Sequence, residues 1–478
     1  MSDIPLPGEE TQPRSRWRVL LRPWVLISLT VVMFLVAAPL VYRSTRFTGI
    51  PPIGEEVSKS DQPPELESEE NAFTFYQAAW DRMPQDLYDR HIDEAADAVL
   101  VDGAAGVPDT VAGLLETHRE MLNEWKRGTE LNSGVDPEPA RAFWFSDSHA
   151  RNSRPITWLA AIRAAKSLEE GKAGEAWSWL RALLRYSRHI GQHATLYERQ
   201  VGIWFHAIAC DQVAAWATHT NVDERLLRQA LKELRELDQL TPSNSSVYRS
   251  EYRSTMKLLS SQAELLEFCN VRLLQRPILD GVPVPLQRSY LFVHGEPELT
   301  QLLLRHVFAN VLTQVDRPRW ERTLAGTRVD LFTPTGKEKP SLMNPADLDQ
   351  AVRRSKLARR LAPSLYSLTA MDQERATQSI LETCMAVELF RRRHDEYPQS
   401  LANLIPEFVS EIPRDPFGST SSDRLLMLHR EAGEDVSLDE KSLRPGVIIY
   451  SVGENGIDDG GLFSRYRDIC LRLPAAVE

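Results

Sequence analysis

The sequence predicts a mainly α-helical protein with an N-terminal transmembrane helix, a body of helical hairpins and a small C-terminal α+β unit with an antiparallel sheet. Three observations predict this class. Residues 23–42 are uncharged and apolar over a length that spans a bilayer. Apolar residues recur at helical spacing through most of residues 71–396. Beyond residue 396 the chain instead holds turn-rich motifs and short apolar runs typical of strands.

Composition and charge limit the classes of function. The chain has 478 residues, which is long enough for several domains. Its 56 Lys and Arg against 67 Asp and Glu give a net charge of −11. A chain with this negative charge is poorly suited to binding the phosphate backbone of a nucleic acid, so we expect no nucleic-acid partner. None of its 4 cysteines is in a Cys-x-x-Cys pair, so we expect neither a structural zinc site nor a disulfide framework.

Residues 23–42 are interpreted as a transmembrane helix. About 20 residues at a rise of about 1.5 Å cover a bilayer core of about 30 Å. Trp24 and Tyr42 stand at its two ends, where interfacial aromatics lie. A buried helix of a soluble protein is one alternative, but this stretch is apolar on all sides. A cleaved signal peptide is another, and Pro39 beside the possible cleavage site argues against it.

The charged flanks of this segment predict its orientation. Four arginines precede it and two follow it: Arg14, Arg16, Arg18 and Arg22, then Arg43 and Arg46. The excess favours a cytoplasmic tail over residues 1–22 and an extracytoplasmic (periplasmic) body. We therefore expect a single-pass protein of the cytoplasmic membrane, in contact with lipid through residues 23–42.

A polar linker and a helical domain are expected next. Residues 43–70 contain paired prolines and many charges, so they are predicted to be a linker to a helical domain at 71–371. Residues 275–296 contain several prolines and glycines and are predicted to be loop or extended chain. Apolar spacing predicts helices at 156–168, 173–190, 195–218, 222–239, 243–273, 297–315, 345–361 and 372–396.

The first two of these helices weakly resemble a tetratricopeptide hairpin. Ala164, Gly171 and Ala176 fall near the small-residue positions of that motif. The fit covers one unit, and no repeat of about 34 residues follows. We therefore expect an array of helical hairpins.

Histidines in the helical domain could form a metal site. His189 and His193 have the i, i+4 spacing of zinc ligands, with Glu198 and His206 nearby. Ile190 stands where the His-Glu-x-x-His motif needs its glutamate. Surface or capping histidines are therefore the favoured interpretation.

Three other patterns also have simpler explanations. Ser254 and Lys257 match the Ser-x-x-Lys of penicillin-recognising serine enzymes, but the partner motifs of that class are absent, so a helical turn is favoured. The basic run 391–394 is expected to complement the C-terminal dipole of its helix. Four tryptophans could line a cleft, although helical spacing favours core positions: Trp177, Trp179, Trp204 and Trp216.

Two linked signatures mark the C-terminal end. The first combines Tyr397-Pro398-Gln399-Ser400-Leu401 with Pro413-Arg414-Asp415-Pro416-Phe417-Gly418. The second runs from Tyr450 to Gly461 and is closed by Asp468-Ile469. Between and after them, apolar runs predict three strands, at 425–430, 447–451 and 469–473.

The order and spacing of these motifs resemble the globular domain of the major pseudopilin of type II secretion systems. The likeness covers residues 372–473 and implies a pseudopilin-like α+β unit at 372–478. The prepilin leader of that family is missing, and the apolar segment lies more than 300 residues away, so assembly into a pseudopilus by the usual route is not expected. The whole chain also resembles membrane-anchored proteins of planctomycete-type bacteria, which implies no activity.

The pseudopilin resemblance also implies a calcium site. In that family the last loop binds calcium through acidic side chains and backbone carbonyls. The matching positions here are Asp458, Asp459 and Asp468, with carbonyls around Val452 and Asn455. Calcium takes about six to eight oxygen ligands, which a glycine-rich loop can supply. The alternative is a glycine-rich turn without metal.

Two functions of different classes remain open. We expect a membrane-anchored interaction or scaffold protein of a bacterial envelope or secretion-type assembly, with a protein partner and no catalytic activity. The alternative is an envelope enzyme that acts on glycan or cell wall with carboxylates in a helical cleft. The first is favoured because the sequence contains no diagnostic catalytic arrangement.

Overall fold

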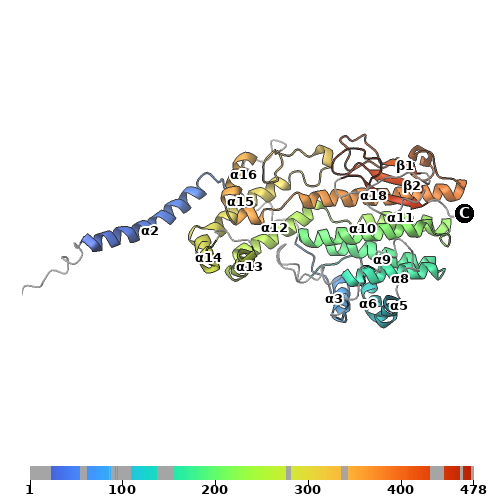
Figure 1. Ribbon diagram of the computed structural model, residues 1–478, viewed down its shortest axis with the longest axis horizontal. Helices are drawn as coiled ribbons and strands as arrows, with labels where there is room; N and C mark the ends of the chain where they lie inside the picture. Colours follow the sequence, from blue (N-terminus) through green and yellow to red (C-terminus); the bar gives the residue numbers. More distant parts are fainter. Residues whose placement is uncertain are drawn as a thin grey trace, which may run out of the picture.

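The fold is mainly helical, with one small antiparallel sheet in its C-terminal part (Figure 1). Helix α2 (Pro23–Phe47) projects from one end of an elongated body, and the sheet lies near the opposite end. A computed structural model describes residues 23–53, 62–84, 109–136, 154–275, 281–334, 343–430, 446–462 and 467–474, with Leu87, Ile92 and Glu94. The predicted cytoplasmic tail, 1–22, lies outside the described residues.

Helix α2 is long and apolar enough to cross a membrane, and its apolar part is not buried against the body. Its 25 residues extend over roughly 38 Å at the usual helical rise. The helix ends at Phe47, five residues past the predicted end at Tyr42. The first part of the predicted linker is therefore the last turn of this helix.

The body consists of helices that pack against one another. Helix α9 packs against both α8 and α10, and α10 packs against α18 (Tyr366–His394). The helices before α18 are α3 (Ala72–Trp80), α5 (Asp109–Thr117), α6 (Arg119–Thr129), α8 (Arg154–Glu169), α9 (Ala173–Gly191), α10 (Leu196–Thr218), α11 (Glu224–Asp238), α12 (Asn244–Ser260), α13 (Gln262–Gln275), α14 (Val284–Val293), α15 (Glu296–Val311), α16 (Pro345–Arg354) and α17 (Ala358–Leu361), with a 3₁₀ turn η4 (Arg319–Glu321).

The C-terminal unit is a helix followed by a three-stranded antiparallel sheet, as predicted. After α18 come a 3₁₀ turn, η5 (Leu401–Leu404), and then β1 (Leu426–Arg430), β2 (Gly446–Ser451) and β3 (Ile469–Pro474). The strand order is β1-β2-β3, and Tyr450 in β2 pairs with Leu426 on one side and Cys470 on the other. Helix α18 covers one face of this sheet through contacts with β2 and β3.

Apolar side chains gather into two cores. The first core joins α3–α11 to the second half of α18 and to the sheet, with Leu183, Leu389 and Ile449 all buried in it. The second core joins α12–α17 to the start of α18. The C-terminal unit therefore shares its core with helices from the N-terminal half of the chain.

Helix α18 links the two cores and carries a buried carboxylate between them. Glu374 is 2% exposed and binds the guanidinium groups of Arg188 in α9 and Arg199 in α10, which are also buried. Arg199 Nη1 lies 3.0 Å from Glu374 Oε1, and Arg188 Nη2 also donates to Gln378 Oε1 at 3.3 Å. Burial alone raises the pKa of Glu374, but the two arginines lower it to about 2. The ion group joins three helices.

Some predicted elements differ from the structure. The predicted loop at 275–296 contains helix α14, because Pro283 precedes the helix and Pro285 lies in its first turn, where no intrahelical N–H is needed. The single helix predicted at 243–273 is instead two helices that meet at Ser261. Helix α18 begins six residues before its predicted start at 372.

Removing the Glu374 charge is expected to destabilise the whole body. Glu374→Gln leaves the buried guanidinium group of Arg199 without a counter-charge and leaves Arg188 only the half-exposed Asp238 at 3.6 Å, which costs on the order of 3–5 kcal/mol. Urea unfolding of the full chain in detergent, followed by tryptophan fluorescence, measures this change. The matched control is Glu224→Gln, which removes an exposed pair with Arg228 and costs at most about 0.5 kcal/mol. Equal effects of the two substitutions would contradict the assigned role.

Candidate functional site

Asp415 joins the two C-terminal signatures. Its buried carboxylate accepts hydrogen bonds from Ser451 Oγ at 2.6 Å and from the Val452 amide at 2.9 Å. It also accepts one from the Phe417 amide at 2.8 Å within its own turn. The proline-rich crossing is thus fastened to the end of β2, where the glycine-rich loop begins. The sequence placed Asp415 in the first signature but did not indicate that its carboxylate joins the two signatures.

The glycine-rich loop after β2 has a fixed shape. Gly453 has φ +63°, and a Cβ there would lie 1.8 Å from the carbonyl oxygen of Arg467, so the position requires glycine. Asp468 is buried and accepts hydrogen bonds from the Gly461 amide at 2.7 Å and the Asp459 amide at 3.3 Å. The loop is therefore closed through its own backbone donors.

The three predicted calcium ligands lie in this closed loop. Asp458 Oδ1 accepts hydrogen bonds from Tyr450 Oη at 3.1 Å and the Gly460 amide at 2.9 Å. Burial raises the pKa of Asp468, its backbone donors lower it, and the charges of Asp459 and Asp458 add to the rise. Among the described residues, no group of three or more His, Cys, Asp and Glu side chains is placed to hold a metal ion. Calcium binding stays a prediction.

The histidines of the alternative zinc site have separate structural partners. His189 Nδ1 lies 2.7 Å from Tyr76 Oη, and His206 Nε2 lies 3.0 Å from Gln378 Oε1. Burial lowers the pKa of both histidines to about 3, so they are neutral at physiological pH. Glu198 accepts from the Thr195 amide and caps the start of α10. Surface or capping histidines were expected; the surface position is wrong for His189 and His206, which are buried.

Most of the tryptophans have the expected core positions, and Arg392 of the basic run has contacts beyond its own helix. Trp177, Trp179 and Trp216 are buried in the first core, whereas Trp204 is 37% exposed. Arg392 pairs with Glu388 and donates to carbonyls at the end of α10, which it caps from another helix. These residues therefore belong to the framework of the body.

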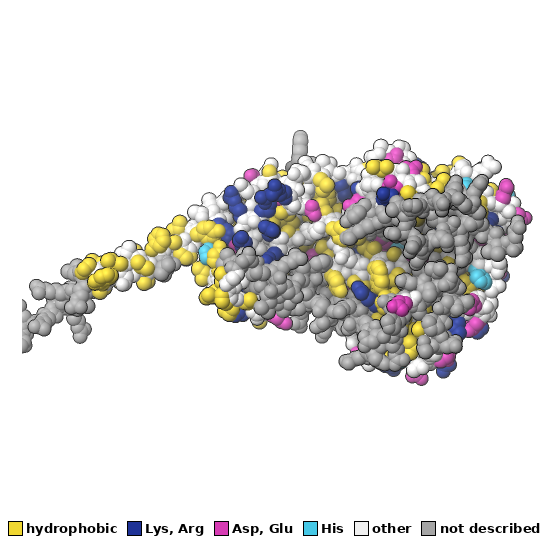
Figure 2. Space-filling view, viewed as in Figure 1, with side chains coloured by type: hydrophobic (Ala, Val, Ile, Leu, Met, Phe, Trp, Pro, Cys, Tyr) yellow, Lys and Arg dark blue, Asp and Glu magenta, His cyan; other side chains and the backbone are white. Residues whose placement is uncertain are grey.

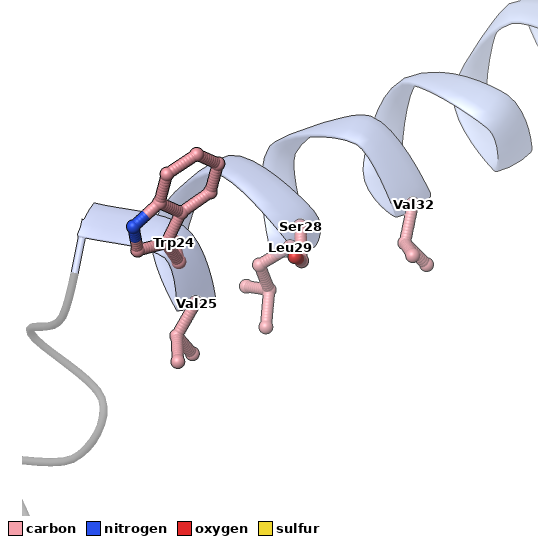
Figure 3. Close-up of a pocket in the computed structure, with 5 residues that line it drawn as sticks. All are labelled: Trp24, Val25, Ser28, Leu29 and Val32. Carbon is pink, nitrogen blue, oxygen red and sulfur yellow. The ribbon is translucent and has the colours of Figure 1, made fainter.

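One hollow lies on α2 and comprises a single helix face. It is lined by Trp24, Val25, Ser28, Leu29 and Val32, which follow one another along about two turns (Figure 3). Its polar side-chain groups are the Ser28 hydroxyl and the Trp24 indole N–H. This composition suits contact with acyl chains and offers no catalytic group.

A second hollow, which we name the α11 groove, lies between α11, the end of α18 and the segment after η5. Its volume is about 380 Å³. Arg228 Cζ lies 5.7 Å from the ring centroid of Phe408, so one wall of the groove is a cation above an aromatic ring. The lining residues are Arg228, Leu231, Lys232, Arg235, Glu236, Gln239, Leu389, Glu407 and Phe408.

The junction between α2 and the body is built around Glu296, the first residue of α15. Glu296 is 1% exposed and forms an ion pair with Arg46 of α2 through Oε1. Its Oε2 accepts hydrogen bonds from Ser355 Oγ at 2.7 Å and the Leu357 amide at 3.2 Å. His306 Nε2 lies 2.9 Å from the carbonyl oxygen of Pro51, further along the chain. Residues 43–53, the first part of the predicted linker, are thus held on the body.

Comparisons with known proteins found no match to a family model, to a curated protein or to a solved structure. The function is therefore argued from the geometry of this chain alone.

Glu251 in α12 is a buried carboxyl group whose ionisation opposes folding. It is 7% exposed and accepts one hydrogen bond from the Leu196 amide at 3.0 Å. Burial raises its pKa from 4.5 to about 7, although that hydrogen bond lowers it. The folded state therefore binds this proton more tightly than the unfolded state. The contribution of this proton to the free energy of unfolding is fully present below about pH 4.5 and is lost as the pH rises through about 7.

Replacing Glu251 is expected to change how stability depends on pH. Glu251→Gln removes the ionisable group. The free energy of unfolding of the variant minus that of the wild type should therefore be more positive at pH 8 than at pH 4.5, by on the order of 3 kcal/mol. Urea unfolding of both chains at the two pH values measures this difference. Glu267→Gln, an exposed position on the next helix, is the control and changes neither value. A Glu251→Gln effect independent of pH would contradict the assignment.

Proposed function

We propose that this chain is a membrane-anchored interaction protein of a bacterial envelope or secretion-type assembly. Helix α2 crosses the cytoplasmic membrane once, with residues 1–22 in the cytoplasm and the body in the periplasm. The observation that carries the proposal is the ion pair between Arg46 of α2 and the buried Glu296 of the body. An anchor joined in this way holds the body at a set orientation to the membrane, which suits display of a binding surface.

The α11 groove is the surface we propose for the partner. It lies in the part of the body far from α2, because α11 packs against α18 near the sheet end (Figure 1). Leu231, Leu389 and Phe408 form its apolar floor, where they are 5%, 1% and 7% exposed, and Lys232 is 79% exposed at its rim. Such a groove suits the apolar face of an amphipathic helix that carries acidic residues. The partner class is therefore a protein with an exposed helix of this kind.

The resemblances of the C-terminal unit to a pseudopilin and of α8 and α9 to a helical hairpin are also part of the proposal. A helix that covers a three-stranded antiparallel sheet supports the pseudopilin-like interpretation of residues 372–478. The antiparallel packing of α8 on α9 supports a helical hairpin there. We propose that the pseudopilin-like unit contributes to the partner surface, because Leu389 of α18 and Glu407 and Phe408 after η5 line the α11 groove.

The alternative, an envelope enzyme, receives less support. A glycosidase needs two facing carboxyl groups with space for a sugar between them. The α11 groove contains Glu236 and Glu407, and each is paired with a cation, Lys232 at 3.8 Å and Arg393 respectively. Neither the hollow on α2 nor the α11 groove combines a buried carboxyl group with an unpaired one.

A photo-crosslinking experiment tests the groove directly. A photoreactive phenylalanine analogue at Gln239, which lines the groove, is expected to give one discrete protein adduct in native membranes. The matched control is the same analogue at Gln229 on α11, whose side chain binds Glu233 and does not line the groove. Because the rim cation Lys232 faces the partner, Lys232→Glu should reduce the Gln239 adduct at least about threefold. Equal adducts at both positions, or no effect of Lys232→Glu, would refute the proposed surface.

A further inference from the structure

The chain gathers cations beside the end of α2. Residues 353–360 contain five cations and no acidic residue, although the whole chain has a net charge of −11. Ser355, Leu357 and Ala358 are buried, so the backbone of this segment is fixed to the body. Arg360 is half-buried, and the other side chains of the segment are exposed. The four exposed cations of the segment are named the junction cations: Arg353, Arg354, Lys356 and Arg359.

The depth of these cations relative to a bilayer follows from their contact with α2. Arg46 Nη2 donates a hydrogen bond to the carbonyl oxygen of Arg354 at 3.1 Å. Arg46 lies four residues beyond Tyr42, which corresponds to about 6 Å along a helix. A bilayer of about 40–45 Å with a hydrocarbon core of about 30 Å has a headgroup layer of roughly 5–8 Å on each side. When residues 23–42 span the core, the junction cations lie at the level of the headgroups.

Helix α14 lies at the same boundary and presents an apolar face. The ring of His294, which follows α14, packs edge-on against Tyr42 with centroids 5.2 Å apart. Leu286 and Val293 are seven residues apart on one face of α14 and are 61% and 52% exposed. Hydrophobic side chains gather over α14, and cations gather beside them where α2 joins the body (Figure 2). The two kinds of side chain occupy the positions of an interfacial amphipathic surface.

We propose that this end of the body rests on the surface of the bilayer that α2 crosses. Leu286 and Val293 enter the boundary between headgroups and acyl chains, and the junction cations bind the phosphates of anionic lipids. The bilayer is the occupant because the anchor ends at this surface, so lipid reaches it whenever α2 is inserted. The inference rests on the proposed membrane anchoring. It adds a second lipid contact, which involves the body itself.

Lipid-dependent quenching tests this contact in the full-length chain. A fluorophore attached at Leu286→Cys, in a Cys470→Ser background, is placed in vesicles that contain phosphatidylglycerol and headgroup-labelled nitroxide lipid. The other three cysteines are buried and react slowly. We expect the emission at Leu286→Cys to fall at least about twofold because the label lies within the headgroup layer. The matched control is Lys232→Cys on α11, far from α2, where no quenching is expected.

Charge and insertion are tested separately. Replacing all four junction cations by Gln is expected to reduce the quenching at Leu286→Cys at least about twofold, as is replacing phosphatidylglycerol by phosphatidylcholine. Flotation after an alkaline wash reports whether α2 is inserted. A chain that floats but shows equal quenching at Leu286→Cys and Lys232→Cys overturns this inference and leaves the anchor intact. A chain that does not float overturns the anchor and, with it, this inference.

Discussion

The body depends on one constraint, which is the buried carboxylate of Glu374 between Arg188 and Arg199. Three helices from distant parts of the chain meet there, and none of the three charges is accessible to water. Buried charges are costly unless they are paired, so α9, α10 and α18 are restricted to the arrangement that pairs them. Since α18 takes part in both cores, the ion group also sets the position of the sheet relative to the second core.

The same reasoning extends to the anchor. Glu296 is buried beneath α2 and bonded to Arg46, Ser355 and Leu357, so its charge is compensated only while the end of α2 lies on the body. Phe47, Ile50 and Ile53 pack against the second core and add apolar contacts to this polar junction. Rigid connections therefore run from α2 through the second core and α18 to the sheet. A body of this form holds its sheet end at a set position relative to α2.

The sequence predicted the local elements better than the long-range contacts. The apolar span, most helices and the three strands follow from apolar periodicity, which depends on near neighbours in the chain. Helix α14 was missed because its prolines were interpreted as breakers, whereas they stand at the start of the helix. The partnership of Arg46 with Glu296 bridges 250 residues, and no local pattern indicates it. No local pattern indicates the hydrogen bond between Ser451 and Asp415 either, because each residue lies in a different motif.

Hydrogen exchange across residues 43–53, with the full chain in lipid nanodiscs, tests the rigid junction most directly. We expect the amides of this segment to be protected from exchange at least about a hundredfold relative to the rates of a free chain, because they belong to α2 and to its contacts with the body. Glu296→Gln should reduce this protection, and Glu298→Gln, at the exposed pair with Arg43, should leave it unchanged. If residues 43–53 of the wild-type chain exchange at the rates of an unstructured linker, the junction between α2 and the body is not rigid.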